Sequence, residues 1–289
     1  MLQQMETKRI MQRKRTNKVF HSLFFVSTII GVLALVMLLI QVLSKGIGWL
    51  DWDFLTNFSS RKPENAGIKA AFVGTLWLMA ITAPLTFIIG VSTAIYLEEY
   101  AKDTWFSRLI QTNIANLAGV PSIVYGLLGL TVFVRLLHFD RSILSGALTM
   151  TLLVLPIIIV SSQEAIRAIP INQRHASFAL GANRWQTIVR VVLPSAIPGI
   201  LTGAILSLSR AIGETAPLIV IGAVSFIAHL PETWFDTFTV MPIQIFNWSS
   251  LPQAEFQNVA AAGILVLLIM LLSMNAFAIY LRNKYQKKQ

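Results

Sequence analysis

The sequence predicts an all-α, polytopic membrane protein with six transmembrane helices. Of its 289 residues, 55% are hydrophobic and only 12% are charged, whereas a soluble domain has about 25% charged residues. Long stretches without Asp, Glu, Lys or Arg run over 19–44, 70–97, 109–134, 142–163 and 256–281. Each matches or exceeds the roughly 20 residues that cross a ~30 Å hydrocarbon core as a helix. A β-barrel would instead show alternating strands of about ten residues.

Basic segments flank the membrane-spanning part at both ends of the chain. Residues 1–20 precede an apolar run that superficially looks like a signal peptide, but the run is too long and lacks an A-x-A-like cleavage site. We therefore expect an uncleaved first span. The predicted organisation is a cytoplasmic segment 1–20, one transmembrane domain over 21–281, and a cytoplasmic basic tail 282–289.

The fifth span allows two arrangements, because Arg210 and Glu214 interrupt the apolar region 191–231. One long helix there gives six spans in all, whereas two short helices with Arg210 in a turn give seven. Six spans with the N-terminus inside leave 16 Lys and Arg residues in the inner segments and 6 in the outer ones, against 12 and 10 for seven spans. The positive-inside rule favours six. Both charges are thus predicted inside the membrane, and both termini in the cytoplasm.

Two long segments fall on the outer side. Residues 44–69 contain turn-forming residues together with Trp49 and Trp52, which suit the membrane–water interface. Residues 231–255 mix aromatic residues with three prolines. We expect the second segment to be an extended or partly interfacial loop and not a span.

Composition and motifs exclude several classes of protein. The chain has no cysteine, so disulfide and thiol chemistry are absent. The chain has a net charge of +10. In a membrane protein, an excess of Lys and Arg is expected in the loops on the inner side, so this charge does not require nucleic acid as a partner. No Gly-Lys dipeptide occurs, so the chain has no G-x4-G-K-[ST] phosphate loop. Neither a nucleophile–base set nor a metal-ligand spacing is present, and we expect no enzyme activity, metal or cofactor in this chain.

The inner loop 164–194 contains signals for two short helices. Pro170 breaks any helix that continues from Glu164, and Asn172 can cap a new one. Gly181 suits the left-handed position that ends a helix, and Asn183 can cap the helix that follows, before Pro194. Two short helices outside the membrane could present a compact knob to a soluble partner, or they could be an ordinary connecting loop.

The stretch H-A-S-F-A-L-G-A-N-R-W-Q-T-I-V-R-V-V-L-P, residues 175–194, resembles the signature loop of permease subunits of bacterial ABC importers, E-A-A-x3-G-x9-I-x-L-P. Ala176, Gly181, Leu193 and Pro194 fall at the family spacing, with Ser177 and Val191 as conservative variants. His175 stands where the family usually has glutamate. In the family this loop docks in a cleft of the ATPase subunit, so the resemblance implies ATPase-coupling roles for these residues together with Arg174 and Leu180.

Three further stretches, 96–101, 201–223 and 251–268, are similar to A-type permease subunits of bacterial phosphate importers, and the likeness covers roughly residues 65–280. It implies a type I ABC importer permease fold in the bacterial inner membrane. It also implies a homologous C-type permease as partner, two ATPase subunits that bind ATP inside, and an external phosphate-binding protein. Alternatives are a permease for another oxyanion or solute, or a membrane regulator that senses phosphate without transporting it.

Arg210 and Glu214 are the main candidates for the substrate pathway. Positions four apart share one face of a helix, with Ser207 and Pro217 near the same stripe, and Thr215 is a further pathway candidate beside Glu214. One interpretation is a neutralised ion pair that joins helices. The other is an anion pathway, because the guanidinium fork matches phosphate oxygens, while Glu214 keeps binding weak enough for release. Sixteen residues separate Pro194 from Arg210, or roughly 24 Å of helix, which places Arg210 toward the outer face.

Weaker candidates lie at the start of the third span and at inner helix ends. Ser122 and Tyr125 could line the pathway, although Gly119 and Gly126 nearby also suit close helix packing. Glu98, Glu99 and Glu164 could contact the ATPase or form a solvated surface.

Overall fold

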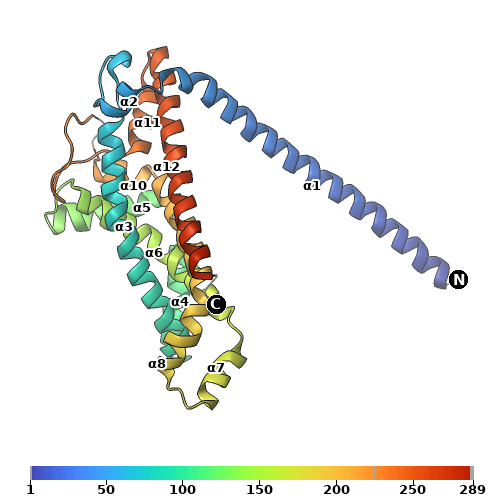
Figure 1. The fold of residues 1–289 in the computed structure, drawn as a ribbon. Helices are drawn as coiled ribbons and strands as arrows, with labels where there is room; N and C mark the ends of the chain where they lie inside the picture. The colour runs from blue at the N-terminus through green and yellow to red at the C-terminus, as the bar shows by residue number, and fades with distance from the viewer. Residues whose placement is uncertain (1, 224–225, 287–289) are drawn as a thin grey trace.

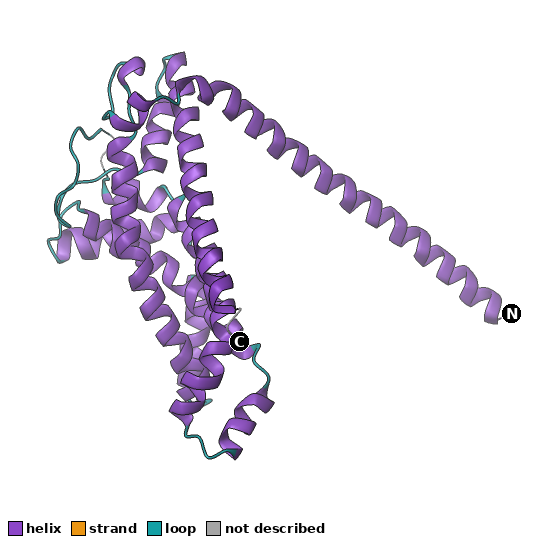
Figure 2. Cartoon of the chain, in the orientation of Figure 1, coloured by secondary structure: helices purple, strands orange, loops and turns teal. Residues whose placement is uncertain are grey.

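The computed structural model describes residues 2–223 and 226–286, which fold into helices and loops without a β-strand (Figure 2). Five helical stretches are long and apolar enough to cross a membrane. They are Asn17–Trp49, Lys69–Tyr100, Ile143–Arg167, Arg184–Ile212 and Ala254–Lys284. Two further helical stretches, Trp105–Leu117 and Ser122–Leu136, are bent by 104° relative to each other and bring the number of spans to six when they are counted together as one broken span. The predicted all-helical, multi-span fold class is confirmed.

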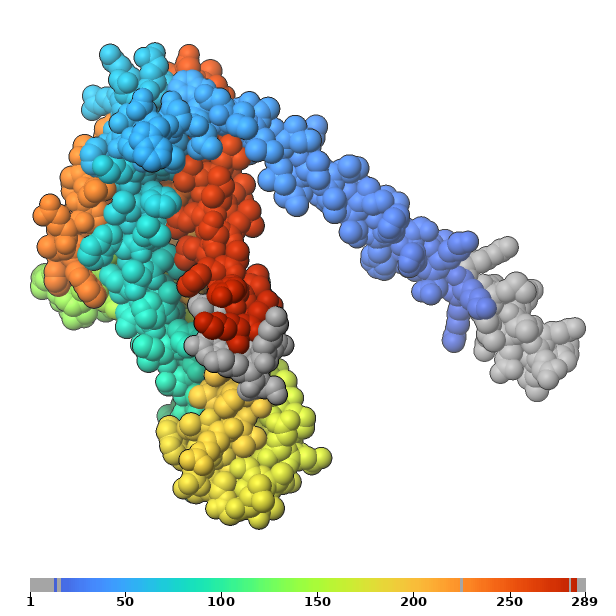
Figure 3. Space-filling model, in the orientation of Figure 1, coloured from blue at the N-terminus to red at the C-terminus, as the bar shows by residue number. Residues whose placement is uncertain are grey.

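The first helix stands apart from the others. Helix α1 (Leu2–Gly46) meets the bundle only near its C-terminal end, beside α12 (Ala254–Gln286), and then runs away from it (Figures 1 and 3). At that junction a Cβ on Gly46 would lie 2.7 Å from the backbone carbonyl carbon of Ala261, so the two helices cross closely. Short helices η1 (Ile47–Trp49), α2 (Trp52–Thr56) and η2 (Pro63–Asn65) follow, with Trp49 packed on the core and Trp52 exposed.

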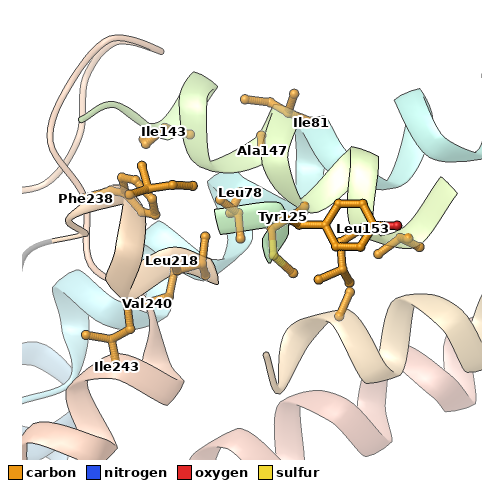
Figure 4. Close-up of a cluster of buried hydrophobic side chains, with 14 of the residues drawn as sticks. Leu78, Ile81, Tyr125, Ile143, Ala147, Leu153, Leu218, Phe238, Val240 and Ile243 are labelled. Atoms are coloured by element: carbon orange, nitrogen blue, oxygen red, sulfur yellow. The ribbon is translucent and has the colours of Figure 1, made fainter. Parts of the chain in front are cut away.

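The bundle itself is built around α3 (Lys69–Ile95) and α6 (Ile143–Arg167), which pack along much of their length. Two apolar clusters fill it. One lies between α3, α5 (Ser122–Gly129), α6 and α10 (Ala216–Ile221), and is shown in Figure 4. The other joins α2, α11 (Met241–Ser250) and α12. A smaller cluster lies near one end, around Ile166 and Val192. We call that end, where α7 (Ile171–Ala179) and α8 (Arg184–Thr187) lie, the α7 end, and the opposite one the α11 end (Figure 1).

The third span is broken, so the predicted single helix over 109–134 is wrong. Helix α4 (Trp105–Leu117) ends before Gly119, and α5 (Ser122–Gly129) starts after Pro121 and continues as the π-helical η4 (Leu130–Leu136). Pro121 has no N–H to donate to a carbonyl four residues earlier, and it disfavours helical geometry in the residue before it. The apolar run therefore makes a sharp turn inside the bundle.

The fifth span also differs from the prediction of one helix across 191–231. It starts at α8 (Arg184–Thr187), passes through π-helical η5 (Ile188–Val192) and α9 (Leu193–Ile212), and stops; α10 (Ala216–Ile221) follows after a short turn. Gly213 lies at the C-cap, and Pro217 would clash with the Gly213 carbonyl in a continuous helix. Gly213 and Pro217 are therefore the sequence signal for a break, whereas the charge count alone favours one continuous helix.

The expected loop over 231–255 contains a buried helix. Helix α11 (Met241–Ser250) begins with a proline in its first turn, where the missing N–H costs nothing. Its residues Met241, Ile243 and Trp248 are almost fully buried. The segment is too short to span a membrane, as predicted, but it belongs to the core.

The loop 164–194 holds one short helix and the start of the fifth span. Helix α7 (Ile171–Ala179) begins after Pro170, so Asn172 lies inside its first turn and is not the cap that was predicted. Gly181 has the left-handed φ of +83°, as expected. Asn183 makes a capping box with Gln186, also as expected, but the helix it starts runs through Pro194 into α9 and is not a separate piece.

Candidate functional site

Arg210 and Glu214 face each other across the break in the fifth span. Arg210 lies in the last turn of α9, and Glu214 lies in the turn beyond it, so a shared helix face is not what unites them. The Arg210 Nε atom is 3.5 Å from Glu214 Oε1. The Arg210 side chain is 65% exposed and that of Glu214 only 17%. The pair is thus an ion pair with most of the guanidinium left open.

The breaks of the third and fifth spans border the same small cavity, of about 10 Å³, which is about the space that one water molecule needs. Its lining includes Arg210 and Glu214 from the fifth span and Ser122 and Tyr125 from α5. The other lining residues are apolar: Leu117, Ala118, Val120, Leu153 and Ile157. Four of the six predicted pathway residues, distant in the sequence, therefore meet at one place. Broken helices inside a membrane are where transporters commonly build their sites.

Tyr125 has a structural task at this place. It is 8% exposed, and its hydroxyl donates a 2.8 Å hydrogen bond to the Leu117 carbonyl at the end of α4. The same carbonyl accepts the backbone N–H of Val120 at 3.1 Å, so Tyr125 adds a second hydrogen bond that joins α5 to the end of α4. Figure 4 shows its ring beside Leu153.

Ser207 and Thr215 are not placed in the lining. Ser207 is 4% exposed and donates its hydroxyl hydrogen to the Gly203 carbonyl one turn earlier in α9. Thr215 takes the N-cap position of α10, and its hydroxyl lies 3.5 Å from the Gly213 carbonyl. Both hydroxyls therefore bond to backbone carbonyls of the fifth span, and neither residue lines the cavity.

The cavity has the chemistry of a weak anion site. The guanidinium offers several N–H donors with a fixed charge, and the first turn of α5, where Ser122 stands, presents the positive end of a helix. Glu214 opposes an anion and limits how tightly it is held. Among the described residues no group of His, Cys, Asp or Glu is arranged to hold a metal ion.

Gly126 sets the distance between the two broken spans. A Cβ at Gly126 would lie 2.7 Å from the Pro217 Cα atom in α10, whereas one at Gly119 would meet only the Asn116 carbonyl at 3.4 Å. We expect Gly126→Ala to push α5 from α10 and to lower the protein's stability by about 1–3 kcal/mol, as overpacking does. Thermal unfolding in detergent measures this, with Gly119→Ala as the matched control. Equal melting temperatures for the two variants would contradict the packing role.

A second surface lies at the α7 end. Of the residues expected to couple to an ATPase, His175, Ala176, Leu180 and Gly181 are exposed. Leu180 is 90% exposed at the tip of the loop, with Phe178 and Trp185 also largely exposed nearby. Such an apolar surface on a loop with a fixed turn is suited to a protein partner.

The other expected coupling residues hold the loop in place. Arg174 is bound to Glu99, with 2.9 Å between Nη2 and Oε1. Ser177 Oγ lies 2.9 Å from Thr187 Oγ1, which joins α7 to α8. Leu193 packs on the apolar cluster at this end, and Pro194 lies within the first turn of α9. These four residues make contacts within the chain, so they would affect a partner by holding the exposed residues of the loop in position.

The π-helical η3 (Tyr96–Tyr100) contributes residues whose partners the sequence did not reveal. Glu98 accepts hydrogen bonds from Gln163 at 2.8 Å and from Arg167 at 2.7 Å, and Glu99 binds Arg174. Neither glutamate is a free solvated charge. The Y-L-E-E-Y-A stretch was a visible signal, but which arginine each carboxylate would meet depends on how α3, α6 and α7 converge.

Comparisons with known proteins agree on one family. Residues 86–287 match the family described as binding-protein-dependent transport system inner membrane component. The chain is 32% identical to the probable ABC transporter permease protein YqgI of Bacillus subtilis, over 96% of this chain and 99% of that protein. It is 34% identical to the phosphate transport system permease protein PstA 1 of Mycobacterium tuberculosis, over 94% of this chain and 90% of that protein.

Solved structures agree on the fold. A chain of the bacterial alginate ABC transporter, in complex with an alginate-bound periplasmic protein, matches with a TM-score of 0.66 and 16% identity, over 91% of this chain and 93% of that one. A chain of the inward-facing MetNI methionine ABC transporter matches with a TM-score of 0.60 and 18% identity, over 73% of this chain and 94% of that one. At such identities the likeness concerns the fold alone.

Proposed function

Because this chain belongs to the binding-protein-dependent transport system inner membrane component family, we propose that it is the transmembrane permease subunit of an ATP-driven phosphate importer. It is a multi-pass inner membrane protein and a transport subunit, not an enzyme. The single observation that carries the choice of cargo is the exposed side chain of Arg210 at the break of the fifth span, beside the start of α5. The name of the mycobacterial relative supports the same choice.

In the proposed pathway Arg210 receives the anion and Glu214 prevents it from being trapped. The guanidinium can bind two phosphate oxygens at once, and its 65% exposure leaves room for them. When no phosphate is present, the 3.5 Å contact with Glu214 neutralises the arginine. Phosphate then competes with the carboxylate for Arg210, so that binding stays weak enough for release. We expect selectivity mainly in the external binding protein.

A second, C-type permease subunit completes the pathway in this proposal. The most apolar stretch of α1 has no residue buried within the chain, and α1 leaves the bundle as an isolated arm (Figure 3). The open side of Arg210 likewise needs a facing wall. A homologous permease would supply both, and would make the anion path from two similar halves.

The remaining proposed partners lie at the two ends of the bundle. Two ATPase subunits, which bind the ATP, would meet the α7 end in the cytoplasm, where both termini would also lie. Closure of the ATPase pair on ATP would displace α7 and alternate access to the cavity. The external phosphate-binding protein would meet the α11 end, which carries a cavity of about 610 Å³ lined in part by Arg61, Ser250 and Gln253.

Transport by the reconstituted complex tests this function. We expect vesicles containing both permeases and the ATPases to take up phosphate when ATP and the binding protein are supplied, and to ignore sulfate and molybdate. Uptake of another oxyanion in preference to phosphate would favour the related-solute alternative. An absence of any ATP-dependent uptake would favour a membrane regulator of phosphate sensing.

A further inference from the structure

Three consecutive residues of η3 each bind a different element at the α7 end. Glu98 binds Gln163 and Arg167 of α6. Glu99 binds Arg174 of α7. The Tyr100 ring lies 5.2 Å from the guanidinium carbon of Arg184 in α8. Successive residues of a helical turn point in different directions, so the single π-helical turn at the end of α3 reaches three neighbours.

The Glu99–Arg174 pair is the buried member of this set. The two side chains are 11% and 14% exposed, against 48% for Arg167 in the neighbouring pair with Glu98. Removing one partner of such a pair leaves an uncompensated charge away from water. By comparison, Asp103 and Arg108 form a pair with both side chains more than two-thirds exposed, where solvent screens the attraction.

Arg174 also joins α7 to α6. Its Nη1 donates to the Ile169 carbonyl at 2.8 Å, and its Nη2 donates to the Ile166 carbonyl at 3.0 Å. Carbonyls at the end of a helix lack N–H donors within it and favour a nearby cation. A single guanidinium therefore binds the inner ends of α3 and α6 from a position on α7.

From this geometry we propose that Glu99 and Arg174 form the rigid joint through which displacement of α7 reaches the spans α3 and α6. The chain connections around α7 are less suited to that task, because they are a short turn through Ala168–Pro170 and the Gly181 turn. Turns absorb a displacement by changing φ and ψ, whereas a buried, multiply bonded ion pair moves as one body. The inference rests on the proposed function, in which α7 is the element that the ATPase moves.

The absence of cysteine in this chain allows spin labels at two introduced cysteines, one replacing exposed Tyr96 and one replacing exposed Gln173. The assembled complex in nanodiscs is measured by pulsed electron paramagnetic resonance without nucleotide and after trapping with ATP and vanadate. With the joint intact we expect the same distance distribution between the labels in both states. In Glu99→Ala we expect the distribution to broaden or shift between the states.

Glu98→Ala is the matched control, because it breaks a pair between α3 and α6 without touching α7. We expect it to keep the label distance constant. In the same complexes, phosphate transported per ATP hydrolysed should fall about tenfold in Glu99→Ala, a typical coupling factor, and much less in Glu98→Ala. If Glu99 only stabilised the protein, Glu99→Ala would lower the yield of complex. It would leave the label distance and the phosphate transported per ATP unchanged.

An unchanged label distance and normal uptake per ATP in Glu99→Ala would overturn the joint. If Glu99→Ala complexes fail to assemble, Glu99→Gln makes the same comparison, because it keeps the shape and one acceptor oxygen but loses the charge. The label measurement uses nucleotide and no transported solute. A wild-type complex that transports no phosphate would therefore contradict the proposed function. The label distances would still test whether Glu99 and Arg174 form a rigid joint.

Discussion

Arg210→Ala is expected to abolish phosphate uptake while the complex still assembles. Arg210 is 65% exposed and its one ion-pair partner in the described part of the chain is Glu214, at 3.5 Å. Loss of the guanidinium removes the cation from the shared cavity and leaves Glu214 to repel the anion. Losing one charged, bidentate contact costs about 2–5 kcal/mol, which corresponds to a fall in transport of roughly 30-fold or more. Uptake by proteoliposomes, normalised to complex recovered by affinity purification, measures the effect.

Two further variants separate the anion role from a structural ion pair. Arg210→Lys keeps the charge but not the planar fork, so we expect partial uptake. Glu214→Gln removes the other half of the pair and should leave the complex assembled, with phosphate held more tightly and released more slowly. If Arg210→Ala and Glu214→Gln instead reduced assembly to a similar degree, the pair would be a structural link. Normal transport by assembled Arg210→Ala complexes would refute the pathway role outright.

Leu180→Glu is expected to release the ATPase subunits from the permease. Leu180 is 90% exposed at the tip of the loop that follows α7, and an apolar anchor buried in a partner commonly contributes 2 kcal/mol or more. A glutamate at this position would have to bury its carboxylate in the ATPase cleft without a cation to pair with it. We expect affinity to weaken by at least about 30-fold. Recovery of ATPase subunits with the tagged permease, followed by titration, measures the loss.

The controls for Leu180→Glu test side-chain chemistry against charge. Leu180→Met keeps an apolar side chain of similar volume and should bind normally. Gln173→Glu adds the same charge at another exposed position of α7 and should have a smaller effect. Helicity and thermal stability of the permease alone should be unchanged in all three variants. Full retention of the ATPases by Leu180→Glu would place the docking surface elsewhere.

Much of the fold could be predicted because hydrophobic spans are encoded locally. Four of the predicted spans correspond to continuous helices, and the basic ends and the Gly181 turn were also visible in the sequence. The two errors in the spans share one cause. Counting charges and measuring the length of apolar runs treats every residue of a span alike. Pro121 and Pro217 have no backbone N–H, so each leaves the carbonyl four residues earlier without its helical hydrogen bond. The local signals for both breaks were present and were outweighed.

The candidate site was predicted in its residues but not in its geometry. Arg210 and Glu214 meet, although across a turn and not on one helical face. Ser122 and Tyr125 join them in one cavity, while Ser207 and Thr215 are engaged by backbone carbonyls. Arg174, expected to couple to an ATPase, is bound to Glu99 within this chain. Each of these outcomes depends on which side chains approach from other helices.

From the sequence one can read that this protein spans a membrane, that Arg210 and Glu214 interrupt one of its apolar regions, and that one loop resembles a docking element. These properties follow from run length, charge balance and spacing, all of which are local. The packing of the helices, in contrast, places the two broken spans around one small cavity beside Arg210 and gives Glu98 and Glu99 different arginines as partners. The physical reason is that neighbouring carboxylates on a helix point in different directions, and the packing of α3, α6 and α7 selects the partner of each.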